Sequence, residues 1–129
     1  GQRELHSDQE KREVRFLESA YEAGYQPFEM GPGSYGATGA QGRGGGILWR
    51  GRNRWEIAVH EANERAVDAF VDDFECAACA VLEWLGGAGE DDIAARIERH
   101  AVMMPGSQAE EKIRINKARS GMPQTPAKR

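Results

Sequence analysis

The side chains best suited to chemistry in this chain are the arginines and aromatic residues between residues 31 and 55. Four arginines occur here without any acidic residue, and Tyr35, Trp49 and Trp55 lie among them. Guanidinium groups bind phosphates and carboxylates bidentately, and aromatic rings stack on bases or anchor protein interfaces. The stretch therefore predicts a binding surface for a protein partner or, as the alternative, for a nucleic acid or nucleotide. The arginines are Arg43, Arg50, Arg52 and Arg54.

A second candidate surface is acidic. Residues 56–99 carry twelve acidic and three basic side chains, although the formal net charge of the whole chain is only −4. Acids recur opposite the apolar side of a helix predicted over about 64–85, and a one-signed face can attract a basic partner by electrostatic steering. The alternative is that these acids form a solvated helix face with no binding role. The acids are Glu61, Glu64, Asp68, Asp72, Glu75 and Glu83, of which we expect Asp68, Asp72 and Glu75 to contact a partner.

Residues 31–46 include eight glycines. Gly31 to Gly36 fits the G-x-G-x-x-G pattern, but that pattern binds a dinucleotide only where it follows a strand and opens a helix. Here more glycine follows. The string from Met30 to Thr38 is similar to the glycine-rich loop of protein kinases, yet the other motifs of that family are absent. We therefore expect a long glycine-rich loop that leads into a binding hairpin.

The remaining reactive side chains form no convergent catalytic set. Cys76 and Cys79 have C-x-x-C spacing but lie within the predicted helix and lack a second pair to complete a zinc site, which predicts two small buried thiols. His60, Glu61 and Glu64 straddle a predicted strand–helix junction with no further ligand close in sequence. We accordingly predict no catalytic residue, no metal and no cofactor.

The elements that position these residues follow from capping and periodicity. A capping box at 7–10 opens a helix predicted over 8–23, which ends at Gly24. Its apolar stripe comprises Val14, Leu17 and Tyr21, widened by Phe16 and Ala20.

Period-two alternation predicts a β-hairpin over about 47–59, and Pro27 restricts a possible strand at 25–30 to a sheet edge. A lattice of apolar residues, with Asn63 as N-cap and Gly86-Gly87 as its end, predicts a long central helix over about 64–85. Two further helices are expected from about residue 90 and from the capping box at 107–110 to about 120.

Together these elements predict an α+β fold in which a small antiparallel sheet packs against the long helix and two or three others. We expect one domain over 1–121 and a polar tail over 122–129. The chain has no apolar run near the roughly 20 residues that span a bilayer and no signal-peptide stretch, so a cytoplasmic location is the expectation. Charge segregation without a catalytic set favours a non-enzymatic binding protein of adaptor or inhibitor type.

Overall fold

The structure is a computed structural model that describes residues 2–103 and 111–116. It confirms an α+β architecture, in which one antiparallel sheet is accompanied by helices. In chain order the elements are α1 (Gln2–Glu22), β1 (Gln26–Gly31), β2 (Ser34–Thr38), β3 (Arg43–Gly51), β4 (Arg54–Glu61), β5 (Glu64–Val71), α2 (Phe74–Leu85), α3 (Glu90–Ile97), the 3-10 helix η1 (Glu98–His100), β6 (Ala101–Val102) and β7 (Ile113–Ile115).

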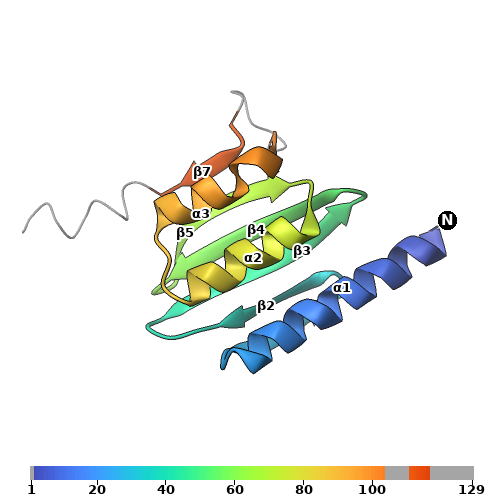
Figure 1. Cartoon of the computed structure of the whole chain (residues 1–129), viewed down its shortest axis with the longest axis horizontal. Coiled ribbons are helices and arrows are strands. Elements are labelled where there is room, and N and C mark those ends of the chain that lie inside the picture. The colour runs from blue at the N-terminus through green and yellow to red at the C-terminus, as the bar shows by residue number, and fades with distance from the viewer. Residues whose placement is uncertain (1, 104–110, 117–129) are drawn as a thin grey trace, which may run out of the picture.

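The first five strands form a meander, with each strand antiparallel to the next, and both β6 and β7 pair with β5. The helices pack on one face of this sheet, with α2 crossing its middle and α1 lying beside β2 (Figure 1). The core between the layers includes Phe16 from α1, Ile57 from β4 and Trp84 from α2, all fully buried. No described helix combines the length and apolarity needed to cross a membrane.

The predicted hairpin is present, because β3 pairs with β4 across a turn in which Asn53 has a positive φ of 56°. The possible strand at 25–30 is β1, which lies at the sheet edge as expected. The helix predicted over 8–23 is α1, but its predicted start is wrong, because α1 begins at Gln2 and the residues of the capping box at 7–10 lie inside it. Its end is close to the predicted one, and Gly24 after it has φ 94°.

The expected glycine-rich loop is wrong, because residues 31–46 contain β2 and the first half of β3. The glycines are needed where elements approach closely. A Cβ on Gly45 would lie 2.9 Å from Val81 Cγ1 of α2. The absence of a side chain at this position therefore lets α2 pack closely against the sheet. A Cβ on Gly36 would lie 2.2 Å from the Gly45 carbonyl oxygen. The glycine-rich composition therefore has a packing role here.

The long central helix over 64–85 is also wrong, since residues 64–71 form β5 and only 74–85 form α2. Ala62 and Asn63 have φ of 54° and 67°, the paired positive values of a tight hairpin turn. Asn63 is therefore a turn residue, and the N-cap is Asp73, whose carboxylate accepts a 2.9 Å hydrogen bond from the Cys76 amide.

The helix expected over 107–120 is wrong at its centre, where residues 113–115 form β7 against β5. Its two ends, and the predicted tail at 122–129, lie outside the described residues. The division into one domain over 1–121 stays a prediction.

Candidate functional site

Two of the predicted binding residues have structural roles. Tyr35 is buried, and its ring packs against Phe16 with centroids 5.6 Å apart. The Arg43 guanidinium lies 3.8 Å from the centroid of the Trp84 ring. It also donates hydrogen bonds of 2.7 and 2.6 Å to the carbonyls of Trp84 and Ala88, and so caps the end of α2. Arg43 is therefore not part of one exposed surface with the other three predicted arginines.

The remaining residues of the predicted hairpin surface do lie together. Arg50, Arg52 and Arg54 are exposed around the β3–β4 turn, and Trp49 is half-buried just before it. Arg50 is paired with Glu56, its Nη2 lying 2.7 Å from a carboxylate oxygen. This surface is consequently less basic than the arginine count alone suggests.

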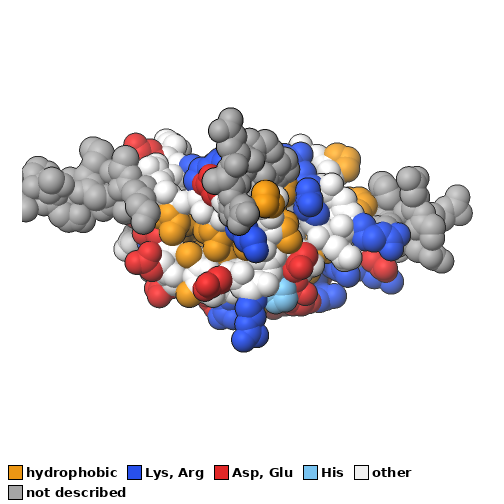
Figure 2. All heavy atoms as spheres, turned by 90° about the horizontal axis from the view of Figure 1, so that it is seen from above, with side chains coloured by type: hydrophobic (Ala, Val, Ile, Leu, Met, Phe, Trp, Pro, Cys, Tyr) orange, Lys and Arg blue, Asp and Glu red, His pale blue; other side chains and the backbone are white. Residues whose placement is uncertain are grey.

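The predicted acidic face has no single helix to support it. Asp68 lies on β5 and is buried, with one carboxylate oxygen 3.0 Å from Arg65 Nη1. Asp72 precedes α2 and contacts His100 at 3.1 Å, whereas Glu75 in the first turn of α2 lies 2.5 Å from Arg15 Nη1. On the side of the molecule seen from above β7 and α3, acidic and basic side chains are interspersed (Figure 2).

No metal site forms from the other candidates. In residues 2–103 and 111–116, no three His, Cys, Asp or Glu side chains converge to hold a metal ion. Both cysteines are free thiols. Cys76 is buried, which raises its pKa to about 11, but Cys79 is exposed, so the expectation of two buried thiols is half wrong. His60 lies on β4, and burial lowers its pKa.

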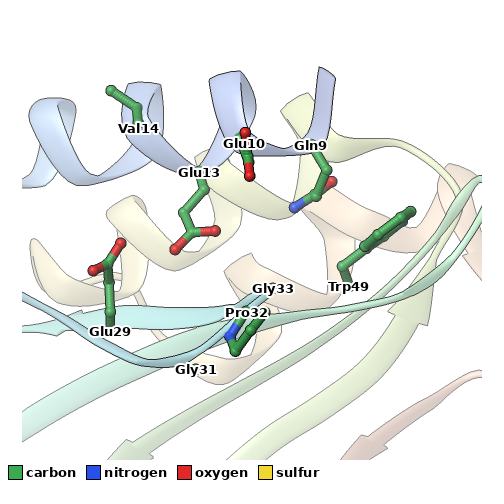
Figure 3. A pocket seen from close by; sticks show the side chains of 9 residues that line it. All are labelled: Gln9, Glu10, Glu13, Val14, Glu29, Gly31, Pro32, Gly33 and Trp49. Atoms are coloured by element: carbon green, nitrogen blue, oxygen red, sulfur yellow. The ribbon is translucent and has the colours of Figure 1, made fainter. Parts of the chain in front are cut away.

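The sequence did not indicate a cleft of about 810 Å³ between α1 and the β1–β2 turn. Side chains from α1 and β1 point into it from opposite sides, and Trp49 of β3 lies at one end (Figure 3). The lining residues are Gln9, Glu10, Glu13, Val14, Glu29, Gly31, Pro32, Gly33 and Trp49.

A buried hydrogen-bond chain fixes the position of α1 over the sheet at this cleft. The Gln9 amide donates to the Tyr35 hydroxyl at 3.3 Å, and the Trp55 indole N–H donates to the Gln9 amide oxygen at 3.2 Å. Gln9 is almost fully buried, and both the nitrogen and the oxygen of its amide are hydrogen-bonded to protein groups, as a buried polar group requires. These two hydrogen bonds attach α1 to β2 and β4 at the wall of the cleft.

Two carboxyl groups face each other across the cleft, Glu13 from α1 and Glu29 from β1 (Figure 3). Burial raises the pKa of Glu13 to about 7, helped by the hydrogen bond and the charge of Glu29. The Gly33 backbone N–H donates to the Glu13 carboxylate and acts in the opposite direction. At neutral pH the pair therefore shares a proton for part of the time, since two adjacent carboxylates repel each other.

An apolar hollow of about 440 Å³ continues from the cleft along α1. Val14 lines both hollows, and Leu17, Tyr21 and Pro27 line the second. We call the two together the α1–β1 groove; its full lining is the cleft residues given above plus Leu17, Glu18, Tyr21, Glu22 and Pro27.

The side chains of the groove are unusually exposed for their type. Val14 is 50% exposed and Tyr21 73%. In the part of the chain that the structure describes, the exposed large apolar residues are Val14, Tyr21, Phe28, Met30 and Met103, and the first four belong to α1 or β1.

The apolar stripe of α1 lines this groove, although its helical periodicity predicted that it packs in the core. Phe16 and Ala20 are the residues of α1 that enter the core, whereas the predicted stripe of Val14, Leu17 and Tyr21 faces outward or lies at the margin. A helix with more apolar surface than one core face needs is a sign of a second contact surface.

Comparison with known proteins gives no further guidance to the site. No protein-family model matches this chain, and no significant similarity to curated proteins or solved structures was found.

Proposed function

We propose that this chain is a small non-enzymatic binding protein, of adaptor or inhibitor type, that holds a protein partner in the α1–β1 groove. The observation that carries the proposal is that Val14 and Tyr21 of α1, which line the groove, are 50% and 73% exposed. Contiguous exposed apolar surface on a small protein marks an interaction site.

The neighbourhood of the groove supports a protein partner. Trp49 lies at one end of the cleft, and Arg52 and Arg54 are exposed at the nearby β3–β4 turn. Tryptophan, tyrosine and arginine are the residue types that contribute most to protein interfaces. The cleft itself carries the carboxylates of Glu10, Glu13 and Glu29, which would repel the phosphates of a nucleic acid.

Site-specific photocrosslinking tests the proposal. A benzoylphenylalanine in place of Tyr21 should crosslink to a defined protein in extracts of the source cells, and the same group in place of Met103 should not. Both positions are exposed, so neither change disturbs the core. Equal crosslinking at the two positions, or crosslinking to nucleic acid only, would contradict the proposal.

A further inference from the structure

A hollow of about 480 Å³ lies between β5 and β7, at the edge of the sheet that is far from α1 (Figure 1). We call it the β5–β7 hollow. Its volume is within the range of small-molecule sites, and it shares no lining residue with the α1–β1 groove. The lining residues are Arg65, Ala66, Asp68, Arg114, Ile115 and Asn116.

The Asp68 carboxylate in this hollow is buried, but only one of its oxygens is paired. Val67 and Ala69 enter the core under the helices, so the alternation along β5 turns Asp68 to the other face of the sheet. Its side chain is 5% exposed. Oδ2 accepts a 3.0 Å hydrogen bond from Arg65 Nη1, whereas Oδ1 has no hydrogen-bond partner among the described residues. An unpaired buried oxygen is costly, so this position favours a ligand that brings a donor.

Two guanidinium groups lie beside the same carboxylate. Arg114 Nη1 is 3.9 Å from Asp68 Oδ2, and Arg114 Nε donates to Glu111 at 3.0 Å. Each guanidinium has five N–H donors, and these contacts use only some of them. The side chains of Arg65 and Arg114 are 55% and 53% exposed, so both can be reached from solvent and can shift as a ligand approaches Asp68.

A ligand that suits these groups must carry a donor and an anionic acceptor close together, because Asp68 and Arg65 are themselves in contact. A phosphate dianion has no proton for Oδ1 and would be repelled by Asp68. A simple carboxylate would leave Oδ1 unpaired, and a simple amine would leave the guanidinium groups without an anion. An α-amino acid has an ammonium and a carboxylate on one carbon, and both would form charge-assisted hydrogen bonds here. Ala66 and Ile115 add apolar lining, which favours an aliphatic side chain.

We propose that the β5–β7 hollow binds a free α-amino acid with an aliphatic side chain. The ammonium of the ligand donates to Asp68 Oδ1, and its carboxylate accepts hydrogen bonds from Arg65 and Arg114. This site is separate from the α1–β1 groove and goes beyond the proposed function, which it neither requires nor tests.

The experiment uses the full chain and three probes of similar shape. Leucine carries both charged groups, isocaproate is leucine without the amine, and isoamylamine is leucine without the carboxylate. The amide shifts of Ala66 and Ile115 are followed by NMR at neutral pH and low salt. Leucine should give saturable shifts with an apparent Kd of about 0.1–1 mM, and each of the other probes should bind at least about tenfold more weakly.

Two variants and a control connect the binding to the named groups. Asp68→Asn should weaken leucine binding at least about tenfold, because it removes the charge that pairs with the ammonium. Arg114→Gln should weaken it at least about fivefold, and since this residue is exposed, the variant tests the site even if Asp68→Asn does not fold. Arg96→Gln is the matched control, because Arg96 is also an exposed arginine paired with a carboxylate, that of Glu83, but lies outside the hollow. It should leave the affinity unchanged.

Three results would overturn the inference. The first is the absence of saturable shifts at Ala66 and Ile115 with leucine up to about 20 mM. The second is equal binding of the three probes, and the third is an unchanged leucine affinity in Arg114→Gln. Crosslinking of a partner at Tyr21 reports on the α1–β1 groove alone, so the proposed function and this inference stand or fall separately.

Discussion

Glu13 links the stability of the fold to pH, independently of any partner. Its pKa of about 7 in the folded protein exceeds the ordinary value of 4.5, mainly because the carboxyl group is partly removed from water and secondarily because of Glu29. The folded state therefore keeps a proton that the unfolded chain loses. The stability that this proton brings is complete below about pH 4.5 and is lost as the pH rises through about 7.

Glu13→Gln should abolish this dependence, because glutamine keeps a neutral hydrogen-bonding group at every pH. At pH 8 the variant should be more stable than the parent by about 1 kcal/mol, a value discounted for the openness of the cleft to solvent. At pH 5 the two proteins should differ much less. Urea unfolding at both pH values measures this, with Glu98→Gln as the control. A constant difference between variant and parent across pH would contradict the assignment.

Arg43 is a structural residue whose loss should be felt by the whole fold. Its guanidinium stacks on Trp84 and donates to two carbonyls at the end of α2. Arg43→Met keeps the length of the side chain but removes the donors, so it should lower the free energy of unfolding by about 2–4 kcal/mol. Arg52→Met, at an exposed turn, should cost less than about 0.5 kcal/mol. Thermal unfolding of both variants decides between a structural and a surface role.

Among the elements, the contact between α2 and β3 depends on the absence of a side chain at residue 45. Gly45→Ala places a methyl group 2.9 Å from Val81 Cγ1 and should cost about 1–3 kcal/mol. Gly44→Ala is the matched control, because its new Cβ would meet only ordinary contacts at 3.8 Å. The two glycines differ in the face of the sheet that their Cβ would occupy.

A double-mutant cycle attributes that cost to the helix. Val81→Ala removes the nearest atom that the new Cβ would meet and leaves Val59 Cγ1 of β4 at 3.1 Å. The double variant should therefore be more stable than the sum of the two single effects predicts, by about 1 kcal/mol. Additive effects measured by denaturant unfolding would show that the strain at residue 45 arises within the sheet.

The elements also show how far local sequence patterns determine this fold. The β3–β4 hairpin and the C-terminal end of α1 were predictable from the turn residues and from Gly24, whereas the start of α1 was not, because the capping box at 7–10 lies inside the helix. Residues 64–71 were not, since Val67, Phe70 and Val71 fit a helical lattice while Val67, Ala69 and Val71 also alternate. Antiparallel pairing with β4 decides in favour of a strand, and that pairing is a tertiary effect.

The candidate site was predictable only in part for a related reason. Trp49 stood out by its residue type. Glu13 and Glu29 each look like ordinary polar positions of a helix and an edge strand, and only the return of the chain through β1 brings them face to face. The glycines of residues 31–46 indicated a loop because their packing partner, α2, lies more than thirty residues further along the chain.

For the molecule as a whole, the arrangement of layers explains why apolar surface remains outside the core. The helices lie on one face of the sheet, and α1 sits at the end of the layer beside the edge strand β1. A helix at that position has a neighbouring helix on one side only, so its outer side chains meet solvent. Val14 and Tyr21 are exposed for this reason, although their spacing is that of a packed stripe.

This arrangement predicts that the exposed apolar residues contribute to association and not to stability. Tyr21→Ser combined with Met30→Ser should change the free energy of unfolding by less than about 1 kcal/mol, because both side chains are already largely in water. Phe16→Ala, at a buried position of the same helix, should cost about 3–5 kcal/mol. The double variant should nevertheless elute earlier from a hydrophobic-interaction column, since it removes two of the exposed large apolar side chains. A large loss of stability with unchanged retention would mean that Tyr21 and Met30 belong to the core, and that the α1–β1 groove, which Tyr21 lines, is not an open surface.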